Sequence, residues 1–176
     1  SGLYKGGENI HPWIGAAVCK KDAGLEVVYT FPWGPAEKAG LIPGDIIVSL
    51  NGQVTSEIAK TQETLVNSFT RTAVTIDWQR GEDSFSNVLL LAPRPNVPLE
   101  QALELDRRVD IIPALFGMRL KESGNVLFKQ NYLVTDIYPG SRADESGISI
   151  DDPLTIRNWS VDEENGIVTM QIRIKK

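Results

Sequence analysis

The fold of the first half of the chain is decided by the stretch Pro35-Ala36-Glu37-Lys38-Ala39-Gly40-Leu41-Ile42-Pro43-Gly44-Asp45-Ile46-Ile47-Val48-Ser49-Leu50-Asn51-Gly52. Proline suits the first helical position, and glycine readily takes the left-handed conformation that ends a helix. The stretch therefore predicts a short helix from Pro35 to Gly40. Ile46 to Leu50 then has the composition of a strand, and Asn51-Gly52 is a strong signal for a tight turn. No residue here is arranged for chemistry, so the stretch indicates a fold rather than an activity.

This pattern resembles the PDZ domain of bacterial HtrA-type proteases, which are trypsin-like serine proteases. The resemblance rests on Pro-Ala-x-x-Ala-Gly-Leu-x-Pro-Gly-Asp-Ile-Ile-x-x-x-Asn-Gly, from Pro35 to Gly52. It implies a mostly β (α+β) fold with short helices, built as a partly open β-barrel. The catalytic domain of such a protease is absent from the sequence. The resemblance therefore implies a regulatory, peptide-binding part of an extracytoplasmic protease, located in the periplasm or cell envelope.

An internal repeat extends this interpretation to the second half of the chain. One constant shift in numbering aligns Tyr138 to Trp159 with Phe31 to Gly52, and a slightly smaller shift aligns Leu115 to Met118 with Trp13 to Ala16. The second copy thus carries about five extra residues, which we expect within 121–130. The sequence predicts two PDZ-like domains in tandem. Their expected order is an arm at 1–11, a first domain at 12–92, a Pro-rich linker and connecting helix at 93–109, and a second domain at 110–176.

The second copy departs from the pattern of the first. Asp151 stands in the place of Gly44, and Asn158-Trp159 replaces the Asn51-Gly52 turn, so we expect the second copy to lose the turn chemistry of the first. The interval before the alternating strand 167–174 is too short for a helix of three turns, which needs about 11 residues. Residues 160–166 therefore cannot supply that helix, and 162–166 are expected to form a polar hairpin turn instead. In the strand that follows, Val168, Met170, Ile172 and Ile174 are expected on one face. We expect a degenerate or truncated domain that lacks its long helix and does not bind peptide tails in the ordinary way.

The resemblance also implies a peptide site in the first domain. Successive backbone amides can bind an anion, and an extended peptide can pair with an exposed strand as an added strand of the sheet. On this basis the peptide's carboxylate is bound by the loop of Trp13, Ile14, Gly15 and Ala16. The peptide itself pairs with the strand that contains Ala17 and Val18. The opposite wall is a helix within 61–72, where the candidate residues are Thr61, Leu65, Ser68 and Phe69.

Several of these side chains also have a plain structural interpretation. Trp13 and Ile14 can be core residues, because the proposed binding uses their backbone amides. Trp33 stands where the family usually has a small residue, and we expect it to pack rather than to be exposed. Cys19 lies in an apolar run and is expected to be a small buried residue.

Composition and residue counts exclude several classes of function. The net charge is −5 with a pI near 5.0, which disfavours nucleic acid or an anionic membrane as the main partner. One cysteine and one histidine, His11, support neither a disulfide within the chain nor a Ser-His-Asp triad. The acidic pair Asp151-Asp152 and the acidic run 162–164 are expected to be solvated turns. We therefore expect no catalytic residue, no metal site and no cofactor.

The leading hypothesis is a non-enzymatic peptide-binding module that regulates a serine protease. Its expected partners are C-terminal or extended peptide segments and the protease domain of the same parent chain, with homo-oligomers possible through that parent. The alternative is a structural or assembly module that mediates oligomerisation or fills its own groove. In that case the helix from Leu99 to Val109 or the second domain could occupy the first groove. An autonomous enzyme is the third hypothesis.

Overall fold

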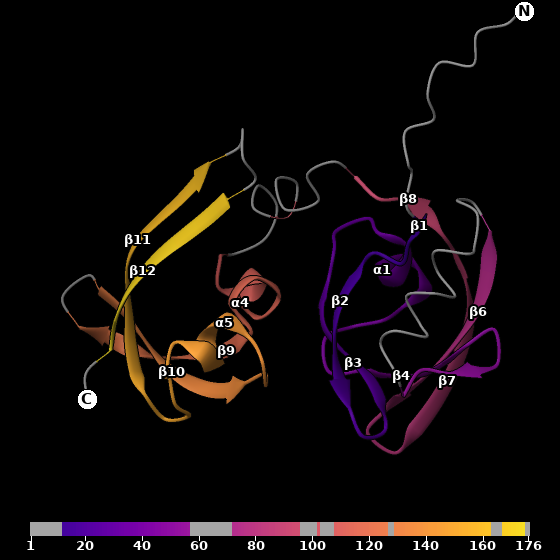
Figure 1. Ribbon diagram of the computed structural model, residues 1–176, viewed down its shortest axis with the longest axis horizontal. Coiled ribbons are helices and arrows are strands. Elements are labelled where there is room, and N and C mark those ends of the chain that lie inside the picture. The colour runs from indigo at the N-terminus through magenta and orange to yellow at the C-terminus, as the bar shows by residue number, and fades with distance from the viewer. Residues whose placement is uncertain are drawn as a thin grey trace, which may run out of the picture. The chain divides into compact units, whose positions relative to one another are not determined.

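The computed structural model describes residues 12–56, 72–95, 102, 108–126, 129–162 and 167–174. The chain forms two compact units, Ser1–Pro98 and Leu99–Lys176 (Figure 1). Both consist mostly of strands, so the predicted fold class is confirmed. Within the described ranges, no helix is long and apolar enough to cross a membrane.

The first unit is built around one antiparallel sheet. Its elements are β1 (Pro12–Trp13), β2 (Ala16–Lys21), β3 (Gly24–Thr30), α1 (Pro35–Ala39), β4 (Ile46–Leu50), β5 (Gln53–Val54), β6 (Ala73–Arg80), β7 (Asp83–Leu90) and β8 (Ala92–Pro93). The main sheet has the order β2-β3-β4-β6-β7, with β5 paired to β4, while β1 pairs separately with β8. Val27, Leu41 and Ile76 are among the fully buried residues that fill the core.

The stretch from Pro35 to Gly52 folds as predicted. Pro35 is the first residue of α1, and Gly40 ends the helix with a φ of +94°. Asn51 and Gly52 have φ values of +49° and +74°, the pair of positive angles that a type I′ turn requires. This turn joins β4 to β5.

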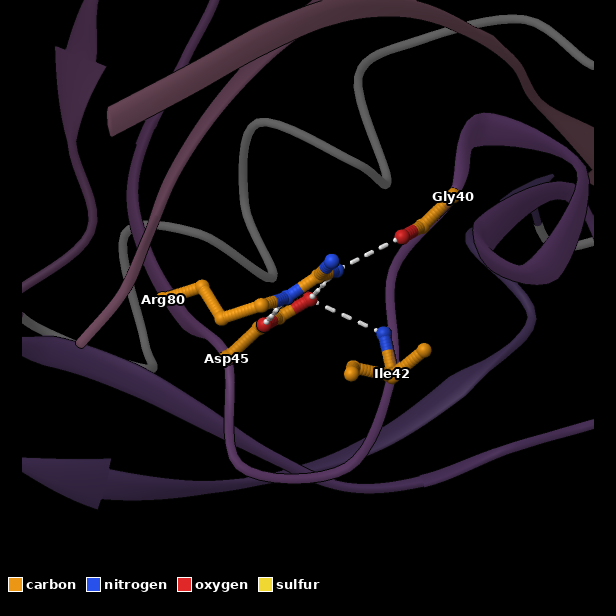
Figure 2. A network of polar contacts seen from close by, with 4 residues as sticks. All are labelled: Gly40, Ile42, Asp45 and Arg80. Carbon is orange, nitrogen blue, oxygen red and sulfur yellow. Dashed lines mark hydrogen bonds and ion pairs between the residues drawn. The ribbon is translucent and has the colours of Figure 1, made fainter. Parts of the chain in front are cut away.

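A buried carboxylate ties this stretch to a distant strand. Asp45 is 0% exposed, and it accepts hydrogen bonds from Arg80 Nε at 2.7 Å and Nη2 at 2.8 Å (Figure 2). The amide of Ile42 donates to the same carboxylate at 2.9 Å, and Arg80 also donates to the carbonyl of Gly40 at 2.8 Å. The end of β6 is thus fixed to the segment between α1 and β4.

A second polar network crosses three strands. Asp77 on β6 accepts hydrogen bonds from the hydroxyl groups of Ser49 on β4 and Ser86 on β7. These hydrogen bonds stabilise the ionised carboxylate, and they lower the pKa of Asp77 below its ordinary value of 3.8, with Ser49 as the larger cause.

The lowered pKa predicts how Asp77 affects acid stability. A carboxyl group with a depressed pKa in the folded state stabilises the fold above 3.8, and this contribution is lost as the pH falls through the folded value. We expect Asp77→Asn to lower the urea midpoint at about pH 6 and to lose less stability than the wild type on acidification to about pH 3. Urea titrations at both pH values check this. Parallel decreases in the two proteins would contradict it.

The second unit repeats part of this architecture. Its elements are α4 (Arg108–Phe116), β9 (Met118–Val126), β10 (Lys129–Ile137), α5 (Arg142–Glu145), β11 (Pro153–Asp162) and β12 (Ile167–Ile174). They form a sheet of order β12-β11-β10-β9 over a separate core that includes Ile112, Tyr132 and Leu154. The hairpin of β9 and β10 is longer than that of β2 and β3, as the extra residues within 121–130 predicted.

The backbone hydrogen bonds repeat at the spacing that the aligned sequences predict. The amide of Leu41 donates to Ala36 at 3.0 Å, and the amide of Ile148 donates to Ala143 at 3.3 Å. Likewise Gly44 donates to Val27 at 2.8 Å, and Asp151 donates to Val134 at 2.9 Å. Ile42 and Ser149 both donate their amides to the aspartate three residues later, at 2.9 Å. The repeat is therefore confirmed as a structural one.

The second copy was expected to lose the turn at Asp151, but the turn is present. Asp151 keeps the left-handed conformation of Gly44, with φ values of +69° and +100° respectively. Aspartate tolerates this region better than most residues, because its short polar side chain can bond locally. The turn therefore survives without its glycine, and the prediction that its turn chemistry is lost here was wrong.

The second unit has no long helix before β12, as the sequence predicted. Asp162 pairs with Ile167, which leaves only residues 163–166 between β11 and β12 and no room for the long helix. Asn158-Trp159 lies within β11 instead of forming a turn. A bulge after Ile156 places Trp159 opposite Met170, on the apolar face of the hairpin. There the Trp159 ring contacts Phe116 with centroids 6.0 Å apart.

The connecting helix predicted from Leu99 to Val109 lies largely outside the described residues, so its limits stay a prediction. The described helix α4 runs from Arg108 to Phe116 and includes Pro113. Proline removes one helical hydrogen bond, and the burial of Ile111 and Ile112, both 0% exposed, supplies the compensating stabilisation. Of residues 99–107, only Ala102 is described; it is helical and buried.

Candidate functional site

The predicted carboxylate-binding loop lies between β1 and β2. The side chain of Ile14 is 6% exposed and belongs to the core. Its carbonyl accepts the amide of Ala36 at 2.8 Å, and the carbonyl of Gly15 accepts the amide of Phe31 at 2.9 Å. Among the hydrogen bonds between described residues, none uses the amide of Ile14 or Gly15. The loop carbonyls of Ile14 and Gly15 thus serve the fold, whereas the amides of these two residues have no acceptor among the described residues.

Gly15 is required by its conformation and by its neighbours. Its φ is +77°, in the region that favours glycine. A Cβ at this position would lie 2.6 Å from Cδ and 2.8 Å from N of Pro35. It would also approach Cα of Gly34 to 3.0 Å. The start of α1 therefore packs directly on the loop and holds its amides in place.

The side chain of Trp13 has a structural role. It is half-buried, and its ring lies 5.2 Å from that of Phe31, which in turn lies 5.0 Å from that of Tyr29. Trp13 also pairs with Ala92 between β1 and β8. The structural interpretation is thus correct for the side chains of Trp13 and Ile14, and the functional prediction depends on backbone amides alone.

The predicted peptide-binding strand is an edge strand. β2 pairs with β3 on one side, and the described part of the sheet ends at β2 on the other. Ala16 and Val18 pack partly against the core, and Ala17, between them in sequence, is half-buried. An edge strand presents a row of backbone N–H and C=O groups that another strand can pair with. The structure therefore brings the loop and the strand together as one continuous segment.

The predicted groove helix cannot be placed in the same way. Residues 57–71 lie outside the described residues, and with them the four candidates Thr61, Leu65, Ser68 and Phe69. These candidates stay a prediction.

Two other residues near the site differ from expectation. Cys19 is only half-buried, and its Sγ lies 3.9 Å from Oε2 of Glu26, which also forms an ion pair with Lys21 at 3.2 Å. Trp33, which we expected to pack, is 65% exposed. Its φ of +56° turns the chain into α1 and directs the side chain outward, so the prediction of packing was wrong.

The corresponding loop of the second unit is used differently. Leu115 and Phe116 are the last residues of α4, and Gly117 follows with a φ of +72°. The carbonyl of Gly117 accepts the amide of Tyr138 at 2.9 Å, as that of Gly15 accepts Phe31. However, the amide of Gly117 donates to the carbonyl of Pro113 at 3.1 Å. In the second unit the helix therefore occupies the glycine amide, whereas the equivalent amide of Gly15 has no acceptor among the residues that the structure describes.

The described residues contain no group of three or more His, Cys, Asp or Glu side chains that could hold a metal ion. Asp151 and Asp152 lie in a surface turn, where Asp152 accepts the amide of Ser149. His11 and residues 163–164 lie outside the described ranges.

Both units combine antiparallel hairpins with a short helix that follows the second strand of a hairpin. In the first unit an edge strand also lies beside a glycine loop. Residues 32–80 match the PDZ domain family, and residues 99–176 match the PDZ domain of the TP0546 family. The chain consists of two PDZ domains in tandem, as the sequence predicted. PDZ domains bind peptides and are not catalytic.

Solved structures with a similar fold include HtrA-type proteases. The protease AlgW with a decapeptide has 22% identity and a TM-score of 0.46, covering 49% of this chain and 30% of its own. The serine endoprotease from Yersinia pestis has 22% identity and a TM-score of 0.44, with the same coverage of 49% and 30%. The PDZ domain of HtrA3 bound to a phage-derived ligand has 22% identity and a TM-score of 0.40, covering 47% of this chain and 85% of its own. The chain thus spans 30% of the length of the first two proteases. No curated protein matches it.

Proposed function

We propose that the first PDZ domain captures C-terminal or extended peptide segments, which pair with β2 as an additional strand. The observation that carries this proposal is the difference between the two glycine loops. The amides of Ile14 and Gly15 are unused within the described residues, whereas the amide of Gly117 is bonded to Pro113. The first loop can therefore donate to a carboxylate, and the second has already lost one of the donors.

In the proposed complex the backbone provides most of the recognition. The peptide pairs with Ala17 and Val18, and its carboxylate accepts hydrogen bonds from the amides around Gly15. The last side chain enters an apolar site that includes the helix expected at 61–72. The loop is held rigidly by Ala36 and Phe31, which bond its carbonyls, so little ordering accompanies binding.

Backbone amide NMR spectra of the full chain test this assignment. On titration with a short peptide that ends in an apolar residue and a free carboxylate, we expect the largest shifts at Ile14, Gly15 and Ala16. Gly117 and Met118 are matched internal controls, because they occupy the equivalent loop, and they should not shift. Equal shifts in both loops, or shifts centred away from β2, would contradict the proposal.

We further propose that the chain is a regulatory part of an HtrA-type serine protease located outside the cytoplasm, in the periplasm or cell envelope. The support is the pattern from Pro35 to Gly52, which resembles the PDZ domains of that family. In this role the first domain would present captured segments to the protease domain of the same parent chain. A trypsin-like catalytic domain encoded in the same gene would support this, and its absence from the complete gene would contradict it.

A further inference from the structure

Trp33 is unusual in both its exposure and its backbone. It lies between β3 and α1, is 65% exposed and has a φ of +56°. A bulky residue in the left-handed region is strained, and a side chain so exposed gains little from burial. Such strain in a folded protein points to a role beyond the fold.

The internal repeat shows what the fold itself requires at this position. The alignment of the two copies places Gly140 on Trp33, and Gly140 has a φ of +73°. The amides of both residues donate to the carboxylate four residues later, Glu37 in one unit and Asp144 in the other. The second unit forms the same turn with glycine, so the turn does not need the indole.

The position of Trp33 connects it to the loop of the candidate site. Phe31, two residues earlier, donates its amide to the carbonyl of Gly15. Gly34, the next residue, packs on Gly15 so closely that a Cβ on Gly34 would lie 3.2 Å from Cα of Gly15. The exposed indole therefore lies at the same end of the domain as the carboxylate-binding loop.

We propose that Trp33 is a ligand-contact residue of the peptide site, where its indole packs against an apolar side chain of the bound protein segment. This inference rests on the proposed function of the first domain. Tryptophan is enriched among residues that dominate binding, because its large ring buries much apolar area. The strain at Trp33 is then retained for binding.

The test compares the wild-type full chain with Trp33→Gly. The probe is a short apolar peptide, prepared with a free C-terminal carboxylate and as the amide. We expect Trp33→Gly to raise the dissociation constant of the free-acid peptide about tenfold. Amide hydrogen exchange at Val27 and Ile47, which lie in the core of this unit, should be unchanged or slower, because glycine relieves the strain. A merely structural tryptophan would give faster exchange.

Ile42→Ser is the matched control, because Ile42 is also apolar and 47% exposed but lies beyond the other end of α1. It should leave both binding and exchange unchanged. If the wild type binds the free acid more tightly than the amide, and Trp33→Gly binds the free acid as tightly as the wild type does, the role of Trp33 is overturned. The proposed function of the domain would then still stand. Absence of binding by the wild type, or equal affinity for the acid and the amide, would overturn the proposed function and with it the role of Trp33.

Discussion

Replacing Gly15 with alanine is expected to destabilise the first PDZ domain by about 3 kcal/mol and to abolish peptide binding. The left-handed φ of +77° and the 2.6 Å approach of a Cβ to Pro35 act together. The clash cannot be relieved by moving a flexible side chain, because the neighbour is the ring of Pro35. The loop or the start of α1 must therefore shift, and the amides of Ile14 and Gly15 shift with it. Urea denaturation and peptide titration of the full chain measure the two effects.

Gly81→Ala is the matched control for this substitution. Gly81 lies in the same unit with a φ of +61°, but no atom lies within 4 Å of its would-be Cβ. It should therefore cost only about 1 kcal/mol, from the backbone conformation alone, and leave peptide binding intact. Similar losses of stability in the two variants, or normal peptide binding by Gly15→Ala, would contradict the packing of α1 on the loop.

Removal of the buried carboxylate is expected to have the second large effect. Asp45→Ala should destabilise the first domain by about 3 kcal/mol, because the amide of Ile42 and the guanidinium of Arg80 both lose the carboxylate to which they donate. The side chain of Asp45 is 0% exposed, so water cannot replace it without entering the fold. The midpoint of urea unfolding, together with amide exchange in β4 and β6, measures the loss.

Asp152→Ala in the second domain is the comparison that the repeat offers. Asp152 accepts the amide of Ser149 just as Asp45 accepts that of Ile42. It is half-buried, however, and the described residues of its unit include no arginine bonded to it. Its loss should cost about 1 kcal/mol. An equal cost at both positions would show that the contact with Arg80 adds nothing to stability.

The sequence was most informative where local chemistry decides the structure. Pro35, Gly40 and the Asn51-Gly52 pair each specify one backbone conformation, and all three were predicted correctly. The repeat was equally readable, because its constant spacing survives in the backbone hydrogen bonds. The absence of the long helix followed from chain length alone, since residues 160–166 are too few for three helical turns.

Features that depend on distant contacts were not readable in advance. Asp45 and Arg80 are 35 residues apart, and nothing local pairs them. Asp151 keeps a turn that its sequence seemed to lose, because aspartate tolerates the left-handed region. The exposure of Trp33 could not be inferred from composition, since apolar residues usually pack. For the proposed binding loop, the sequence named the residues. Only the structure shows that the amide of Gly117 is bonded, whereas those of Ile14 and Gly15 have no acceptor among the described residues.

The central claim is that the amides of the first loop bind a peptide carboxylate. Isothermal titration calorimetry of the full chain tests it directly, with one apolar peptide prepared as the free acid and as the C-terminal amide. Hydrogen bonds to a charged acceptor are the stronger ones, so the free acid should bind about 30-fold more tightly than the amide. Equal affinity of the two peptides, or no binding of either, would contradict the claim.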